Sequence, residues 1–516
     1  MFSTTTGQVG FFDAAELMGP LPEGSFFALL AEHGERIVRD EDFADCYSER
    51  LGRPSIPPSR LAKVLLLQYR TGLSDEQAME AVAWDLRWKI ALGLPVDHAG
   101  WSSSTLTRFR ARLLLHGKER LALENTLSLA GELGLLDAPA EQIVDSTPML
   151  GAAATQDTVR LVRSGVRGLI DAVADADEQA AQALDDGLEF DYSRPAEKPG
   201  CRWREKAERE RMLTRVAEDA ERALRAVERA DGLLGEDAVR EAHSLLRELV
   251  GQDFDVDEAG VPRLHRGTRQ DRIISMVDPE MRHGRKSKHQ RFDGYKLSAA
   301  ATNTPEPLIT AVEVAPASEQ DGPQAKRLID AQPAERRPER VLGDTAYGNS
   351  DTLEELEQRD VGVLAPPATS RNGSGFHKEE FEIDLGAGTV TCPAGKVARI
   401  SKPDRQGERR ANFRRSDCGA CPLKQRCTAS DRRSIQIGRR EDLLQAARLA
   451  LEDPDTAEHL RRTRPRIERL LGLLAHRYGA RKTRYIGAAK ARLQALWTAA
   501  LVNLNPIGQR LVGQGA

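Results

Sequence analysis

Apolar positions in the first 137 residues recur at the spacing of amphipathic helices. Ser74 with Gln77 forms a capping-box sequence, which predicts the start of a helix. Val82, Leu86 and Ile90 fall on one face of that helix and are expected to point inward. The sequence therefore predicts a helical N-terminal region.

A further helix in this region pairs an apolar face with a basic one. Leu106, Phe109 and Leu113 lie on its inner face, and Arg108 and Arg112 lie one turn apart on its outer face. A series of short helices whose last member carries arginines resembles a helix-turn-helix module, in which that last helix enters the major groove of DNA. A helical bundle with solvated arginines fits the same pattern equally well.

The apolar period changes to that of strands after the first helices, and a long helical segment interrupts the strands. An apolar run from residue 142 ends at Asp145, and alternation resumes from residue 268. The expected order is a strand at 142–145, helices through 156–260, strands near 295–299 and 308–314, a helix near 325–329, a strand at 340–343, a helix capped at Thr352 and a strand at 361–364. This order predicts a mixed α/β (α+β) fold with helices packed on a sheet.

These changes of pattern divide the chain into four parts. The predicted parts are a helical N-terminal domain (1–137), a discontinuous α/β domain (138–155, 268–370 and 440–516), an acidic helical insertion (156–267) and a four-cysteine insertion (371–437).

Composition narrows the class of protein. Of 516 residues, 40% are hydrophobic and 30% charged, which excludes collagen-like and wholly disordered chains. No apolar run approaches the roughly 18 residues that span a bilayer, and the N-terminus lacks a secretory pattern. We expect a cytoplasmic protein without membrane contact.

The net charge of −4 hides an uneven distribution. Residues 171–260 hold 25 Asp and Glu against 13 Lys and Arg, so the rest of the chain is net basic. The overall charge therefore does not argue against a polyanionic partner.

Two aspartates each end an apolar strand. Asp145 and Asp344 are both followed by a small polar residue, and ligands gather at strand ends in α/β sheets. Two carboxylates held together repel each other unless a cation neutralises them, and Mg²⁺ prefers such oxygen ligands. Either aspartate alone is more often a turn or cap residue.

A third acid stands alone in a basic segment. Glu468 is the only acidic residue in 461–490, among ten Lys and Arg, and Arg464 lies one turn before it. Two roles fit it equally well, an ion-pair partner or a metal ligand on a phosphate-binding surface.

Together these residues carry a resemblance to a known family. The segments IVDST around Asp145, DPEMRHGRKSKHQRFDGYK at 278–296, VLGDTAYGN around Asp344, and Arg464 with Glu468 resemble bacterial insertion-sequence transposases of the DDE type. SSSTLTRFRARL at 102–113 resembles the leading helical domain of that family. The resemblance covers about residues 50–505.

The resemblance implies a ribonuclease-H-like core in which Asp145, Asp344 and Glu468 form the catalytic triad. Such a triad holds two Mg²⁺, which Mn²⁺ can replace, for hydrolysis of DNA at terminal inverted repeats and transfer of the 3′-OH into target DNA. The implied partner is double-stranded DNA, bound by a homodimer associated with the bacterial nucleoid. A non-catalytic DNA-binding protein, either a decayed transposase or a repressor, is the alternative.

The sequence departs from one signature of related transposases, Tyr-x2-Arg-x3-Glu-x6-Lys. Arg461 replaces the tyrosine and Ala475 the lysine, so the roles of those two residues do not transfer. Arg477 is a weak substitute. The residues expected to contact DNA are Arg108, Arg112, Arg285, Lys286, Lys288, Arg291, Lys296, Arg464, Arg477, Arg481 and Lys482.

Four of the six cysteines fall within 36 residues. Cys392, Cys418, Cys421 and Cys427 include a C-x2-C pair, and this spacing favours a structural Zn²⁺ site over disulfides in a reducing compartment.

Overall fold

A six-stranded mixed sheet forms the centre of the computed structural model, which describes residues 1–4, 14–48, 54–136, 140–287, 289–368, 375–405 and 407–515. Its strands are β1 (Glu141–Leu150), β4 (Arg282–Arg285), β5 (Arg291–Thr302), β6 (Ile309–Pro316), β7 (Arg340–Leu342) and β8 (Gly362–Leu364). The mixed α/β fold predicted from the sequence is confirmed.

The central strand β1 has antiparallel neighbours on one side and parallel neighbours on the other. It pairs with β5 from Gln142↔Thr302 to Leu150↔Gly294, and β6 and β4 continue the sheet beyond β5. On its other side β7 and then β8 run parallel to it. This order is that of a ribonuclease-H-like sheet.

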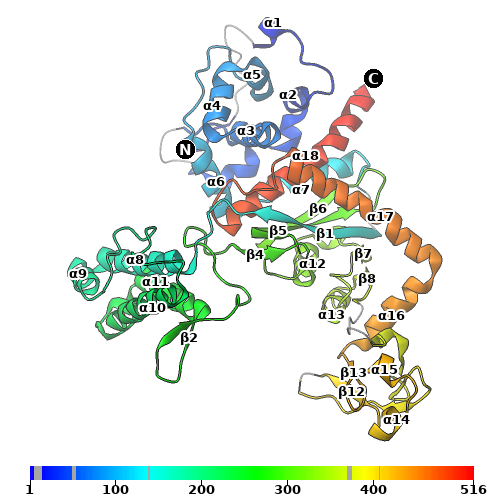
Figure 1. Ribbon diagram of the computed structural model, residues 1–516. Helices are drawn as coiled ribbons and strands as arrows, with labels where there is room; N and C mark the ends of the chain where they lie inside the picture. The colour runs from blue at the N-terminus through cyan, green and yellow to red at the C-terminus, as the bar shows by residue number, and fades with distance from the viewer. Residues whose placement is uncertain are drawn as a thin grey trace.

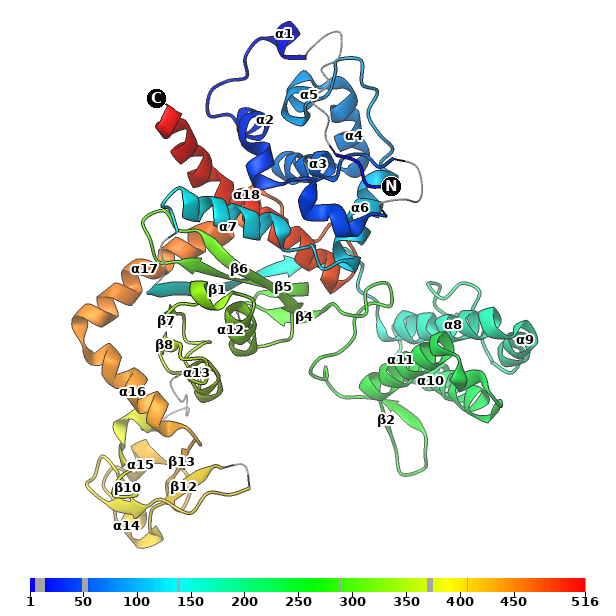
Figure 2. The same cartoon turned by 180° about the vertical axis from the view of Figure 1, so that it is seen from behind.

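Helices cover both faces of the sheet (Figures 1 and 2). Alternation along β1 places Val144 in a core with α12 (Asp321–Asp330) and α13 (Ser350–Glu357). Ile143 belongs to the opposite core, with α7 (Leu121–Glu132), α17 (Pro454–Gly472) and α18 (Ala488–Gly515). The start of α13 differs from the prediction, because Asn349 rather than Thr352 caps it.

The N-terminal region is helical, as predicted, and is drawn in blue in Figure 1. Its other helices are α1 (Ala14–Met18), α2 (Phe26–Ile37), α3 (Pro58–Thr71), α4 (Asp75–Trp84), α5 (Leu86–Leu92) and α6 (Ser104–Leu115). The capping box of Ser74 and Gln77 is present. The single helix expected through Ile90 is wrong, because Asp85 ends α4 and its carboxylate accepts from the Arg87 N–H to begin α5.

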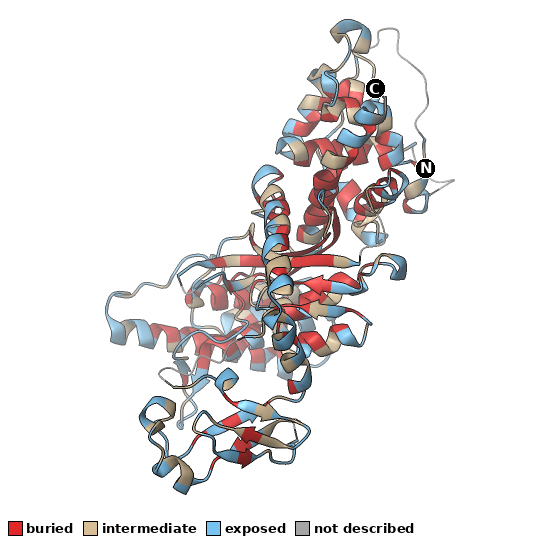
Figure 3. Cartoon of the chain, turned by 90° about the vertical axis from the view of Figure 1, so that its right-hand side faces the viewer, coloured by how far each residue is buried: buried red, intermediate tan, exposed pale blue. Residues whose placement is uncertain are grey.

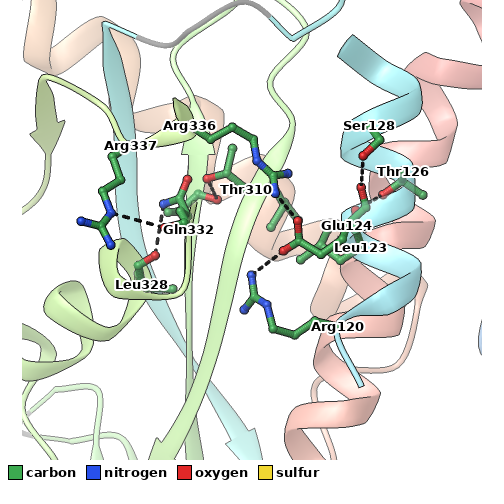
Figure 4. A network of polar contacts seen from close by, with 12 residues as sticks. Arg120, Leu123, Glu124, Thr126, Ser128, Thr310, Leu328, Gln332, Arg336 and Arg337 are labelled. Carbon is green, nitrogen blue, oxygen red and sulfur yellow. Dashed lines mark hydrogen bonds and ion pairs between the residues drawn. The ribbon is translucent and has the colours of Figure 1, made fainter. Parts of the chain in front are cut away.

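The last N-terminal helix is tied to the sheet domain by charge as well as by packing. Glu124 on α7 accepts a hydrogen bond from Arg120 at 2.9 Å and pairs with Arg336, which lies just before β7 (Figure 4). Helix α18 also contacts α3, α6, α7 and β6. The N-terminal helices and the sheet therefore share one continuous core.

The acidic insertion has a hydrophobic core of its own. Its helices are α8 (Thr158–Ala176), α9 (Glu178–Asp186), α10 (Lys206–Arg229) and α11 (Asp237–Asp253). The fully buried Asp219 holds it together by accepting from Tyr192 Oη at 2.9 Å and from the Glu189 and Phe190 N–H groups. The helical pattern predicted through residue 260 is wrong at its end, where β2 (Phe254–Val256) and β3 (Pro262–Leu264) form a hairpin.

The four-cysteine segment folds as a small module beside the sheet domain. It contains β9 (Glu382–Asp384), β10 (Thr389–Thr391), β11 (Val397–Arg399), β12 (Arg409–Asn412), β13 (Ser434–Ile437), α14 (Arg415–Gly419) and α15 (Lys424–Cys427). Helix α16 (Glu441–Glu452) joins the module to α17. Figure 3 shows that buried residues concentrate in the sheet and its covering helices and are sparse in this module.

The boundaries predicted at 137/138 and 370/371 lie in segments outside the described residues. In the described part of the chain, no helix is long and apolar enough to cross a membrane.

Candidate active site and DNA-facing surface

Neighbouring parallel strands bring Asp145 and Asp344 together near the centre of the sheet. The prediction that a strand ends at Asp145 is wrong, because β1 continues to Leu150 and Asp145 lies within it. The last register pair between β1 and β7 is Ile143↔Leu342. Each aspartate follows two residues later on its own chain, so the two occupy equivalent positions. Asp145 also lies on the same face of β1 as Ile143, which is the face that α17 covers.

Backbone amides orient both carboxylates. The Ser146 N–H donates to Asp145 Oδ1 at 2.8 Å, and the Ala346 N–H donates to Asp344 Oδ1 at 2.9 Å. The turn after β7 is closely packed, because a Cβ at Gly343 would lie 2.7 Å from the buried ring of Tyr347. Tyr347 thus fixes the turn that carries Asp344, a role that sequence reasoning missed.

Helix α17 carries the third predicted acid across the same face. Ile467, Leu470 and Leu471 are buried in the core that contains Ile143. Glu468, next to Ile467, has a side chain that is 57% exposed. Arg464 Nη2 lies 3.7 Å from Glu468 Oε1, as the i, i+4 spacing predicts.

The side chains of Asp145, Asp344, Glu468 and Arg464 interact electrostatically. Burial, together with the neighbouring carboxylates of Asp344 and Glu468, raises the pKa of Asp145 to about 6. The Ser146 amide and the Arg464 guanidinium oppose that rise in pKa. Asp145 is thus a half-buried carboxylate near two others, with one arginine as the cation that offsets them.

The donor chemistry fits a hard divalent cation, because all three candidate ligands are carboxylates. Their spacing is not that of a closed metal site. Among the described residues, no group of three or more His, Cys, Asp or Glu could hold a metal ion as it stands. For all three carboxylates to bind one cation, the exposed Glu468 side chain would have to leave Arg464 and turn toward the aspartates.

A basic hairpin lies beyond the carboxylates, past the carboxyl end of β1. Arg285 and Arg291 face each other across β4 and β5, and both are exposed. Two like charges in this position repel each other, so a polyanion would stabilise the pair. Lys286 is exposed beside them, whereas Lys288 lies outside the described residues.

Lys296, predicted to contact DNA, is held inside the sheet domain. Its Nζ lies 3.1 Å from Asp321 Oδ1 and donates to the Glu319 carbonyl at 2.6 Å, which leaves its side chain 15% exposed. Its charge is already neutralised within the fold.

Basic residues after α17 also reach the end of β1. The Leu150 N–H donates to the Arg481 carbonyl at 2.9 Å, and Leu150 forms a parallel bridge with Lys482. Lys482 and Arg477 are exposed. Arg477 belongs to a π-helical turn, Leu473–Arg477, directly after α17.

The arginines of the N-terminal helices differ in how far they are exposed and in whether they already have a partner. Arg108 is exposed, as predicted for an outward position on α6. Arg112 stacks on Tyr47, with its Cζ 4.1 Å from the ring centroid. Arg110, which the helical pattern did not single out, is buried and bonded to Asp75.

The four clustered cysteines line one small cavity. Its volume is about 30 Å³, and all four cysteines are free thiols. Burial raises the pKa of Cys427, and the three neighbouring thiols raise it further while Arg433 lowers it. The Lys396 and Arg433 N–H groups point at the sulfurs of Cys392 and Cys418, at 3.4 and 3.5 Å. The thiols converge, but like the carboxylates they do not form a closed metal site.

Comparison with known proteins gives two matches. Residues 16–112 match a family model described as a transposase domain (DUF772), and residues 391–507 match one described as a transposase DDE domain. No curated protein and no solved structure matches the chain. The first match covers the helices from α2 to most of α6, and the second covers part of the cysteine module and the helix that carries Glu468. With the ribonuclease-H-like sheet between them, these matches indicate an insertion-sequence transposase of the DDE type.

Proposed function

We propose that this transposase cleaves and joins DNA with Asp145, Asp344 and Glu468 as its catalytic carboxylates. The observation that carries the proposal is that Asp145, within β1, and Asp344, just after β7, lie two residues beyond the same register pair, under the helix that bears Glu468. Transposases bind DNA, and the DDE domain implies nuclease and transposition activity in general.

The bound cations in this proposal are two Mg²⁺, which Mn²⁺ can replace, and they supply Lewis-acid activation of the attacking and leaving oxygens. Asp145 and Asp344 would hold them from the sheet, and Glu468 would complete the ligand set from α17. Arg464 offsets part of the negative charge of these carboxylates, and it would be free to bind a DNA phosphate if Glu468 turned toward a bound cation.

The reaction has two displacements at phosphorus. Water attacks the phosphodiester at the end of the element, the P–O bond to the 3′ oxygen breaks, and that oxygen leaves as a 3′-OH. The 3′-OH then attacks a phosphodiester of target DNA and releases a new 3′ oxygen. Because each step exchanges one P–O bond for another, no protein nucleophile or energy source is needed.

Basic residues around the carboxyl end of β1 provide the proposed DNA-binding surface. Arg285, Lys286, Arg291, Arg477, Arg481 and Lys482 lie on this side of the molecule, and Arg108 and Arg112 extend it onto the N-terminal helices. We leave Lys296 out, because its ion pair with Asp321 occupies it. The bound DNA would be the terminal inverted repeats, with a homodimer joining the two ends.

We also propose a structural Zn²⁺ bound by Cys392, Cys418, Cys421 and Cys427. The convergence of four thiols on one cavity supports it, as do two N–H groups directed at sulfurs. Thiolates that close on a zinc ion would stabilise a module whose own core is small.

Substitution of single carboxylates tests the catalytic proposal. Asp145→Asn and Glu468→Gln should each reduce Mg²⁺-dependent nicking of DNA bearing the element's ends by more than about 100-fold and leave DNA binding intact. Even an outer partner of a metal ligand is worth about 10- to 100-fold. Glu458→Gln is the matched control, since Glu458 lies on the same helix and pairs with Arg461 and Arg462.

Undiminished nicking by either variant would overturn the triad. Binding without cleavage by the wild-type protein in both Mg²⁺ and Mn²⁺ would favour the alternative, a non-catalytic DNA-binding protein.

A further inference from the structure

The outer face of the cysteine module is polar and basic. Ala398, Ala411 and Ile435 point into the core of the module. A bridge between Ile400 and Ala411 joins β11 to β12, and β12 pairs with β13. Because side chains alternate along strands, the neighbours of these inward residues point to solvent.

Three adjacent strands contribute to this outer face. Its members are Arg399 and Ser401 from β11 and its extension, Arg410 and Asn412 from β12, and Ser434 and Gln436 from β13, and we call them the basic face. One carboxylate lies beside them, Glu408, which accepts from Gln436. The basic face therefore combines two guanidinium groups with neutral hydrogen-bonding groups.

The arginines of this face have no carboxylate partner in the described part of the chain. Neither Arg399 nor Arg410 forms an ion pair there, although most exposed arginines of the acidic insertion do. The surrounding segment is also basic, because residues 396–433 hold twelve Lys and Arg against four Asp and Glu. Such an excess of positive charge repels itself unless a polyanion is bound.

The base of the module is fixed relative to the catalytic domain. Arg440 Nη2 lies 2.8 Å from Glu357 Oε2 and Arg440 Nη1 3.4 Å from Glu354 Oε1, and both acids belong to α13. Helices α16 and α17 then lead from the module to Glu468 (Figure 1). The basic face is thus tied to the helix that carries the third carboxylate.

We propose that the basic face is a second DNA-binding site, which grips the phosphate backbone of duplex DNA outside the catalytic site. Hydroxyl, amide and guanidinium groups are the usual donors to phosphate oxygens, and the nearby aromatic side chains Phe381 and Phe413 are buried and do not face outward. The contact is therefore independent of DNA sequence. This inference rests on the proposed function for its substrate, DNA, but not on the triad.

Charge reversal in the full chain tests this site. Arg399→Glu/Arg410→Glu should bind an unrelated duplex of about 40 base pairs roughly ten-fold more weakly at ~100 mM salt, and the slope of log affinity against log salt should fall by about two. Fluorescence anisotropy over a salt series gives both values. The matched control is Arg204→Glu/Arg229→Glu, which changes the net charge equally at exposed positions of the acidic insertion without an ion pair in the described structure; it should bind as the wild type does.

The outcomes separate this site from the triad. Asp145→Asn should keep the wild-type affinity and salt slope, even if the catalytic proposal fails. Equal losses in the two charge-reversal variants would overturn the second site, as would unchanged binding by Arg399→Glu/Arg410→Glu. The charge-reversal variant could instead bind DNA as the wild type does but no longer self-associate at low salt without DNA. That result would overturn the second DNA-binding site and indicate that the basic face binds the acidic insertion of a second copy. Thermal unfolding of the variant, unchanged from the wild type, excludes misfolding as the cause.

Discussion

Asp145 and Asp344 occupy equivalent positions on neighbouring chain segments, each two residues beyond Ile143↔Leu342, the last pair between β1 and β7. Residues 145 and 344 are far apart in sequence, and only the parallel pairing of β1 and β7 makes them neighbours. Their repulsion contributes to the raised pKa of Asp145. The fold thus maintains an electrostatic cost that a bound cation would remove.

The first prediction concerns stability in the absence of metal. The pKa of folded Asp145, about 6, lies above its ordinary value of 3.8, so the ionised carboxylate destabilises the fold. The penalty is absent below about pH 4, grows up to about pH 6 and then stays at about 3 kcal/mol. Asp145→Asn should therefore raise the unfolding temperature in EDTA at pH 7.5, and not at pH 4.

Thermal unfolding followed by circular dichroism measures this difference, and Mg²⁺ should stabilise the wild type and not the variant at pH 7.5. A variant less stable than the wild type in EDTA at pH 7.5 would contradict the prediction.

The second prediction concerns Arg464. Its guanidinium opposes the rise in the pKa of Asp145 and lies 3.7 Å from Glu468. Arg464→Gln should lower the unfolding temperature in EDTA at pH 7.5 and enlarge the stabilisation by Mg²⁺, because the carboxylates lose their internal cation. Arg469→Gln, at an exposed position of the same helix, is the control. If Mg²⁺ raised the unfolding temperature of the two variants equally, Arg464 would not offset the negative charge of the carboxylates.

The third prediction concerns metal in the cysteine module. Elemental analysis of reduced, freshly purified protein should find about one zinc per chain. Cys421→Ser should lose the zinc and expose the module to proteolysis, whereas Cys201→Ser, outside the cluster, should retain the metal. If the wild-type protein contained no zinc, the zinc proposal would be wrong and the four cysteines would be ordinary thiols.

The fourth prediction concerns the basic hairpin. Arg285→Ala/Arg291→Ala should weaken DNA binding and reduce the salt slope by about two, because two phosphate contacts are lost. The same change removes a like-charge pair, so the unfolding temperature should not fall. Lys296→Ala should do the reverse, with lower stability and an unchanged salt slope, since Lys296 pairs with Asp321. An unchanged salt slope in the hairpin variant would place the DNA elsewhere.

Local patterns in the sequence determined most of the elements. Alternation identified β5 and β6, the capping box at Ser74 marked the start of α4, and the i, i+4 spacing predicted the contact of Arg464 with Glu468. Predicted helix boundaries were wrong where capping by a single polar residue outweighed hydrophobic periodicity. One such residue is Asp85, whose carboxylate begins a new helix. Asn349 capped α13 for the same reason.

Tertiary structure decided which of these residues meet. The sequence supplied three acids without the register that aligns Asp145 with Asp344, since strand pairing is a long-range choice. It also presented Lys296 and Arg291 as equivalent cations, although one is neutralised in the sheet domain and the other is exposed. Charge and periodicity are properties of the chain itself. Whether a charge is paired, buried or free depends on neighbours that only folding brings together.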